Sequence, residues 1–66
     1  MELTINGEIK EFSDDITLEK ILEKLELKDK VMAAAVNMQI VKQNEWATHR
    51  LCDGDKIELL DFVGGG

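Results

Sequence analysis

The Asn6-Gly7 pair near the start of the chain restricts the fold more than any other short segment. It separates residues 2–5, in which polar and apolar residues alternate, from residues 8–12, which return as a second strand. Asn-Gly is the pair that a two-residue type I′ turn prefers, because both turn residues need positive φ. Leu3 and Ile5 share one face of the first stretch. The pattern predicts a β-hairpin with one buried face and one wet face.

A short helix is predicted after the hairpin. Thr17 can accept a hydrogen bond from a backbone N–H as N-cap. An acidic residue follows in the first turn, where its negative charge interacts favourably with the helix dipole. Four apolar residues then recur at positions i, i+3, i+4 and i+7, which makes one stripe along the helix. They are Leu18, Ile21, Leu22 and Leu25. We expect this stripe to lie on a sheet.

Three further strands are predicted in the second half of the chain. Residues 31–36 read as a strand whose small alanines would let the helix pack closely, and residues 39–41 read as a short edge strand. Residues 42–51 form a loop with a helical turn, anchored by Trp46 and Leu51. Asp53-Gly54-Asp55 is a turn by composition, and the last strand follows it. The order of elements predicts an α+β fold with two layers, a mixed sheet of four to five strands and one helix on one face.

The last predicted strand, residues 56–63, changes character along its length. Ile57 and Leu59 share one face, while the other face begins with charged residues and ends with apolar ones. An exposed face that becomes apolar is typical of an interaction surface. We therefore predict a docking patch for a partner protein, with acidic residues that steer toward a basic rim. Its residues are Glu58, Leu60, Asp61 and Phe62.

Three glycines, Gly64 to Gly66, end the sequence and have no side chains that could stabilise a fold. Extended residues span at most about 3.3–3.6 Å each, so three of them reach roughly 10 Å beyond the strand. Such a thread fits a channel that is too narrow for side chains. The sequence thus predicts a folded domain over residues 1–63 and a flexible glycine tail over residues 64–66.

Composition excludes several classes of function. The 66 residues suffice for one small domain, and their net charge of −6 would be repelled by nucleic acid and by anionic lipid. Cys52 is the single cysteine and is interpreted as a small packing residue, while His49 lacks the partners of a metal ligand or general base. The turn at residues 53–55 lacks the further oxygens of a calcium loop. We expect a cytoplasmic protein with no metal site, no bound cofactor and no membrane span.

The chain resembles the β-grasp, or ubiquitin-like, proteins and, more closely, the ThiS family of bacterial sulfur carriers of thiamine biosynthesis. The resemblance covers nearly the whole chain, and each of its motifs would be weak evidence by itself. Beyond the hairpin, its motifs are Ala35-Val36-Asn37, Ile40-Val41, Trp46, Leu51, Asp53-Gly54-Asp55, Ile57 and Gly64-Gly65-Gly66. The essential glycine pair of the family corresponds to Gly65 and Gly66, and Gly64 is a common addition.

The resemblance implies a covalent role for the carboxylate of Gly66. An E1-like enzyme would use ATP and Mg²⁺ to adenylate it, a sulfur donor enzyme would supply sulfur that replaces AMP, and the thiocarboxylate would give its sulfur to thiazole synthase. Gly64 and Gly65 would fit the channels of these partners. The chain itself would catalyse nothing, so no residue of it is expected to be catalytic.

Other functions remain open from the sequence. The small subunit of molybdopterin synthase is a related carrier with a Gly-Gly terminus, although the short chain and the region of Trp46 favour the thiamine pathway. A β-grasp interaction module with incidental glycines, or a modifier that is conjugated to proteins, would also fit. Complex formation with either synthase, and the state of the C terminus after exposure to an activating enzyme, would distinguish these functions.

Overall fold

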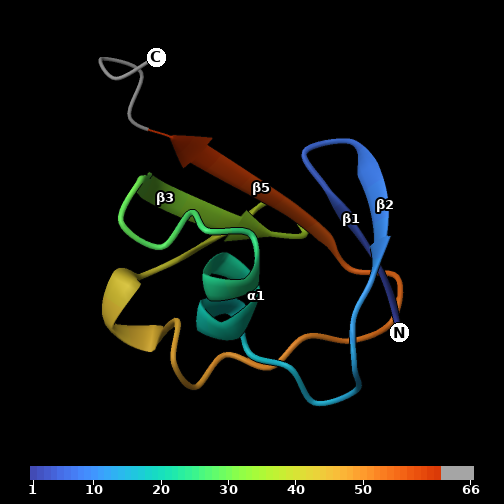
Figure 1. The fold of residues 1–66 in the computed structure, drawn as a ribbon. Helices are drawn as coiled ribbons and strands as arrows, with labels where there is room; N and C mark the ends of the chain where they lie inside the picture. Colours follow the sequence, from blue (N-terminus) through green and yellow to red (C-terminus); the bar gives the residue numbers. More distant parts are fainter. Residues whose placement is uncertain (62–66) are drawn as a thin grey trace.

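The computed structural model describes residues 1–61 and shows a five-stranded mixed sheet with helix α1 packed on one face (Figure 1). The elements in this part of the chain are β1 (Glu2–Ile5), β2 (Glu8–Glu11), α1 (Leu18–Lys24), β3 (Val31–Val36), β4 (Gln39–Val41), a 3-10 turn (Gln43–Glu45) and β5 (Lys56–Asp61). The strand order is β2-β1-β5-β3-β4, so the last strand lies at the centre. β5 runs parallel to β1 and antiparallel to β3. The predicted α+β, β-grasp architecture is confirmed.

The predicted hairpin is present, and its turn explains its register. Asn6 and Gly7 both have positive φ, 50° and 87°, as a type I′ turn requires. Ile5 therefore pairs with Glu8, and the alternation places Leu3 and Ile5 on the buried side. The opposite side of the hairpin is exposed, as expected.

The helix begins where the sequence predicts. The Thr17 hydroxyl accepts a hydrogen bond from the backbone N–H of Lys20 at 3.3 Å, which satisfies one of the free donors at the helix start. The first three residues of the apolar stripe, from Leu18 to Leu22, are buried. Leu25 is the C-cap and lies partly buried against the core. The helix is thus short, and its place on the sheet rests on the apolar stripe.

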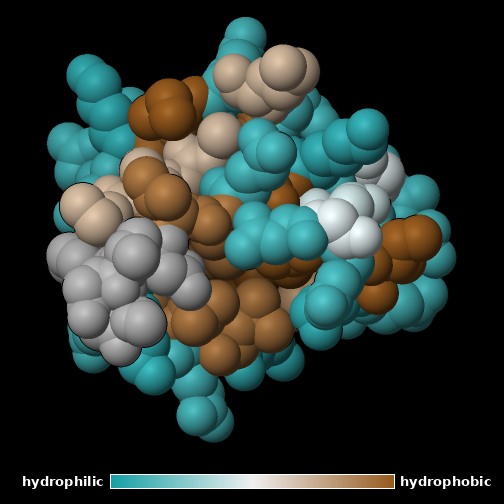
Figure 2. Space-filling view, turned by 90° about the horizontal axis from the view of Figure 1, so that it is seen from above, coloured by the Kyte–Doolittle hydropathy of each residue, from teal (hydrophilic) through white to brown (hydrophobic). Residues whose placement is uncertain are grey.

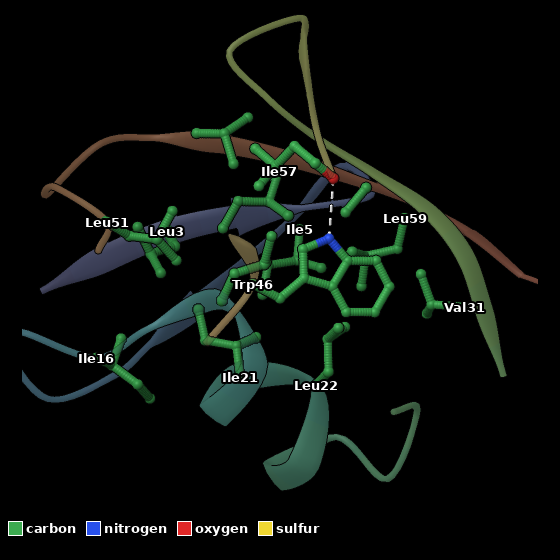
Figure 3. Close-up of a cluster of buried hydrophobic side chains, with 14 residues drawn as sticks. Leu3, Ile5, Ile16, Ile21, Leu22, Val31, Trp46, Leu51, Ile57 and Leu59 are labelled. Atoms are coloured by element: carbon green, nitrogen blue, oxygen red, sulfur yellow. Dashed lines mark hydrogen bonds between the residues drawn. The ribbon is translucent and has the colours of Figure 1, made fainter. Parts of the chain in front are cut away.

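The core lies between α1 and the sheet and is closed by the loop after β4 (Figure 3). Trp46 is buried there, and its indole Nε1–H donates to the backbone carbonyl of Val41 at 2.9 Å. The single polar atom of the ring is therefore satisfied, and the rest of it fills apolar space. Leu51 is buried as well, so both predicted anchors of the loop are confirmed.

Two predictions about packing need correction. Only the middle one of the three alanines, Ala34, faces the core, because alternation along β3 turns Ala33 and Ala35 to the other face of the sheet. Of the three alanines, Ala34 alone therefore contributes to the core. Cys52 is exposed and is no packing residue. It precedes the tight turn, where the Asp55 carboxylate accepts its backbone N–H at 2.8 Å and the side chain is left at the surface.

The turn at residues 53–55 has a structural use. The carboxylate of Asp53 accepts the backbone N–H of Glu2 at 2.6 Å, and the Gly54 N–H donates to the Glu2 carbonyl at 2.7 Å. The turn thereby holds the start of β1 next to the start of β5. Over residues 1–61, no group of three or more His, Cys, Asp and Glu side chains is placed to hold a metal ion. None of the helices in that range has the length and apolar character needed to cross a bilayer.

Candidate functional site

The candidate site is the end of β5 together with the sheet surface around it. β5 is the central strand and leads directly into residues 62–66. The predictions for Phe62, for the tail over residues 64–66 and for its flexibility lie outside the described residues. Asp61 ends β5, and its backbone pairs with Val31. The structure therefore places the strand that carries the tail, and the site is built from the side chains next to it.

Alternation along β5 separates two sets of side chains. Ile57 is 1% exposed and Leu59 is also buried, whereas Leu60 is 57% exposed on the other face. Lys56 and Glu58 are exposed as well, as the sequence predicts. The charged start of the outward face and the exposure of Leu60 are thus confirmed, and Leu60 is the last but one residue of the strand.

Neighbouring strands extend this apolar surface. Ala33 pairs with Leu60 across the β3–β5 ladder, and Ala35 pairs with Ile40 across the β3–β4 ladder. Ile40 is 71% exposed. We call these four residues, Ala33, Ala35, Ile40 and Leu60, the open-face patch. Figure 2 views the molecule from the side of the sheet away from α1 and shows hydrophobic side chains gathered on that face.

The open-face patch is concave because its centre consists of alanines. Ile40 and Leu60 rise on either side of the short side chains on β3, and the shallow hollow between them is also lined by Asn6 and Glu58. Large apolar side chains around a small-residue floor can receive a partner's apolar side chain and exclude water from it. The hollow is open to solvent, and its shape could receive a side chain of a partner protein.

An irregularity in β3 lies beside the end of β5. Val31 pairs with Asp61 and Ala33 pairs with Leu60, so Met32 is an extra residue in the β3 strand. Such a bulge bends the strand and increases its twist locally. Met32 is exposed at this point. The sheet is therefore irregular on the β3 side at the position where β5 ends.

The electrostatics of the patch differ from those of the helix side. Glu58 is the acidic residue that borders the hollow, and no polar side chain among residues 1–60 is buried without a hydrogen-bond partner.

On the helix side, the carboxylate of Glu19 and, after it, that of Glu23 raise the pKa of Lys28. His49 is partly exposed, and only its backbone groups make hydrogen bonds in the described structure.

Sequence reasoning identified part of this surface and missed part. It found Leu60 and Glu58 from the alternation of the last strand, but it did not include Ile40, Ala33 or Ala35. The missing signal was the pairing register, which brings β3 next to β5 and β4 next to β3, so that their outward side chains share one face. Parity alone could have placed Ile40 outward, because its neighbour Val41 is buried.

Comparison with known proteins identifies the family to which this fold belongs. Within residues 1–61, an opening hairpin, one α-helix and a central final strand define a β-grasp protein. The ThiS family model matches residues 3–66. The crystal structure of a thiamine biosynthesis protein (ThiS) from Geobacter metallireducens superposes with a TM-score of 0.83 at 26% identity, covering all of both chains. The chain belongs to the ThiS family.

Two curated relatives support the same assignment. The sulfur carrier protein ThiS of Escherichia coli (strain K12) is 33% identical over 66 residues, which is the whole of both proteins. A thiazole synthase of Paramagnetospirillum magneticum (strain ATCC 700264 / AMB-1) is 39% identical over the whole chain, and the chain spans 20% of that protein's length. The function is that of a sulfur carrier in thiamine biosynthesis, and the molybdopterin synthase alternative is not favoured.

Proposed function

We propose that the carboxylate of Gly66 is the group that carries sulfur. The observation that supports this most directly is the family match, which extends through residue 66 and so includes all three glycines. An α-carboxylate has an ordinary pKa of about 3.3–3.7, so it is anionic at neutral pH and resists nucleophilic attack. It must first receive a good leaving group.

The reaction then needs two steps. An oxygen of the Gly66 carboxylate attacks the α-phosphorus of ATP, held with Mg²⁺ by an E1-like enzyme, and pyrophosphate leaves. Sulfur at the oxidation level of sulfide, delivered by a sulfur donor enzyme, then attacks the acyl carbon. A C–S bond forms as the C–O bond to AMP breaks, and a thiocarboxylate results. The carrier is a co-substrate in both steps and supplies no catalytic residue.

Thiazole synthase is the proposed acceptor of the sulfur. A segment similar to this whole chain occurs within a protein named thiazole synthase. Joining two proteins in one polypeptide raises their effective concentration toward each other, which is useful only where they meet in function. This arrangement supports a thiazole synthase as the partner of the separate carrier. We also place the protein in the cytoplasm, where ATP is available to the activating enzyme.

The partners would dock on the surface beside the tail. The open-face patch supplies exposed apolar area next to Leu60, and Glu58 borders it. The sequence predicts that Asp61 and Phe62 also belong to the docking surface. Together with the open-face patch, they would provide the binding energy while Gly64 and Gly65 enter the partner's channel. A few apolar side chains in the centre of an interface usually dominate its binding energy.

Reconstitution tests this proposal. The purified chain is incubated with ATP, Mg²⁺ and the E1-like enzyme of the same cell, and the adenylate on Gly66 is detected by mass spectrometry. Deleting Gly66, or adding one residue after it, should abolish adenylation and leave the unfolding midpoint almost unchanged. An unmodified wild-type C terminus under these conditions would favour an interaction module and overturn the proposal.

A further inference from the structure

The side chain of Asn6 makes a contact that the hairpin turn itself does not need. Its Oδ1 accepts the backbone N–H of Leu59 at 2.8 Å, and its Nδ2 donates to the Leu59 carbonyl at 3.4 Å. The two residues are 53 positions apart in the sequence. One amide side chain therefore pairs with both backbone groups of a residue in β5, as a neighbouring strand would.

This contact continues a ladder that the backbone cannot continue. β1 and β5 pair through Thr4 with Lys56 and through Ile5 with Ile57, and the Asn6 N–H then donates to the Ile57 carbonyl at 2.9 Å. After Asn6 the chain turns away into β2. The Asn6 side chain takes the place of the next β1 residue and extends the pairing to Leu59.

On the β1 side, this contact is the last support of β5, while on the β3 side Leu60 and Asp61 still pair with Ala33 and Val31. Leu59 is buried, so its N–H and carbonyl would be costly to leave without partners. On the opposite side of β5, the β3 ladder is interrupted by the bulge at Met32. Asn6 thus provides the last regular pairing on the β1 side before the strand leads through Leu60 and Asp61 into the tail.

We propose that Asn6 is a positioning residue for the carrier reaction: by holding Leu59, it fixes the path of β5 from which the reactive tail continues. The inference rests on the proposed function, because it matters only if the tail must reach a partner's active site while the domain is docked. Misplacement of a reacting group by about 1 Å can lower a rate on the order of a hundredfold. Loss of the Asn6 side chain should therefore slow the adenylation of Gly66 markedly, while the free energy of unfolding falls only a little.

The chain contains a matched control for this test. Asn37, in the β3–β4 turn, has φ of 51°, nearly the same as Asn6, and its Oδ1 accepts the backbone N–H of Lys56 at 3.0 Å. Its Nδ2 donates to Asp55 at 2.9 Å. Asn37 thus holds the beginning of β5 with the same chemistry by which Asn6 holds the end. Glycine tolerates positive φ, so Asn6→Gly and Asn37→Gly each remove a side chain without adding backbone strain.

Steady-state adenylation by the E1-like enzyme with ATP and Mg²⁺ distinguishes the two variants. We expect kcat to fall on the order of tenfold for Asn6→Gly, with a smaller change in KM, because the variant keeps the four apolar side chains of the open-face patch and loses only the amide at the border of its hollow. Asn37→Gly should stay within about twofold of the wild type. Asn6→Asp keeps the acceptor for the Leu59 N–H but places a carboxylate against the Leu59 carbonyl, so its kcat should be intermediate.

Amide hydrogen exchange provides a readout that is independent of the reaction. Exchange at Leu59 should be faster in Asn6→Gly and unchanged in Asn37→Gly, and exchange at Lys56 should show the reverse. Equal kcat values for the two glycine variants, or equal Leu59 exchange in Asn6→Gly and the wild type, would overturn the inference. If wild-type protein is not adenylated at all, the proposed function fails, and the exchange data still decide whether Asn6 holds β5.

Discussion

The two faces of the sheet both carry apolar side chains of β5, but those on one face are buried and those on the other are exposed. On the helix face, Ile57 and Leu59 from β5 are buried with α1 and Trp46. On the open face, Leu60 and Ile40 are apolar but exposed. Burial against the helix accounts for the first set. The second set gains little from burial in the fold, and its gathering on one face supports the proposal that it contacts a partner protein.

This difference separates stability from binding along a single strand. Moving one residue along β5 changes the side chain from one face to the other. A strand at the centre of the sheet can therefore hold the domain together through one set of side chains and present a docking surface through the other. Variants on each face should affect one property and spare the other.

The largest effect is expected on the helix face. Ile57→Ala removes a side chain that is 1% exposed and leaves a cavity, which should lower the free energy of unfolding by about 2–5 kcal/mol. Leu60→Ala on the same strand should change it by less than about 0.5 kcal/mol. Denaturant unfolding followed by circular dichroism measures both. Equal losses of stability would mean that the two faces are not distinct in the way that the structure shows.

The next effect concerns binding on the open face. Leu60→Ser and Ile40→Ser should each weaken binding to the activating enzyme by about 1 kcal/mol or more, because apolar groups at an interface centre carry most of its energy. Phe62→Ser is expected to do the same from the sequence. Titration calorimetry with the E1-like enzyme gives the affinities, and unfolding curves show whether the variants remain folded.

Ile9→Ser is the control for these binding variants. Ile9 is also apolar and 67% exposed, but it lies on β2, two strands away from β5. Its replacement should leave the affinity near that of the wild type. Should Ile9→Ser weaken binding as much as Leu60→Ser, the docking surface would not be centred on the end of β5.

A smaller effect is expected at an exposed apolar residue outside the patch. Met38 lies in the β3–β4 turn with φ of 71°, a left-handed conformation that disfavours side chains. Met38→Gly should raise the free energy of unfolding by about 1 kcal/mol and leave partner binding unchanged. Thermal unfolding and the same calorimetric titration test the two expectations. A loss of affinity would extend the docking surface to this turn.

The smallest effect involves the charges on the exposed surface of α1 and on Lys28, which follows the helix. Glu19 and then Glu23 raise the pKa of Lys28 above 10.5, with Lys28 Nζ 3.5 Å from an oxygen of each. Because the folded pKa is the higher one, the stabilisation is present below the unfolded pKa of about 10.4 and is lost as the pH rises through the folded value. The stability difference between wild type and Lys28→Met should thus be slight at neutral pH and vanish in strong alkali. A difference independent of pH and of salt would exclude the ion pairs as its cause.

Local chemistry in the sequence predicted most of the fold. Asn6-Gly7 specified the hairpin because few other pairs accept two positive φ values, and Thr17 marked the helix start. Features that depend on pairing between distant strands could not be predicted in this way. The position of Ile40 across β3 from Leu60, the bulge at Met32 and the Asn6–Leu59 contact all follow from the sheet register. Cys52 was misplaced because the carboxylate of Asp55 orders its backbone and leaves its side chain at the surface.

The most direct test of the sulfur-carrier function is the intact mass of the protein isolated from its native cell while thiamine is being made. We expect a fraction of the molecules to have one carboxylate oxygen of Gly66 replaced by sulfur, located there by fragmentation. This fraction should disappear when the activating enzyme is deleted. A wild-type C terminus that stays a plain carboxylate in cells actively making thiamine would contradict the assignment of the sulfur to Gly66.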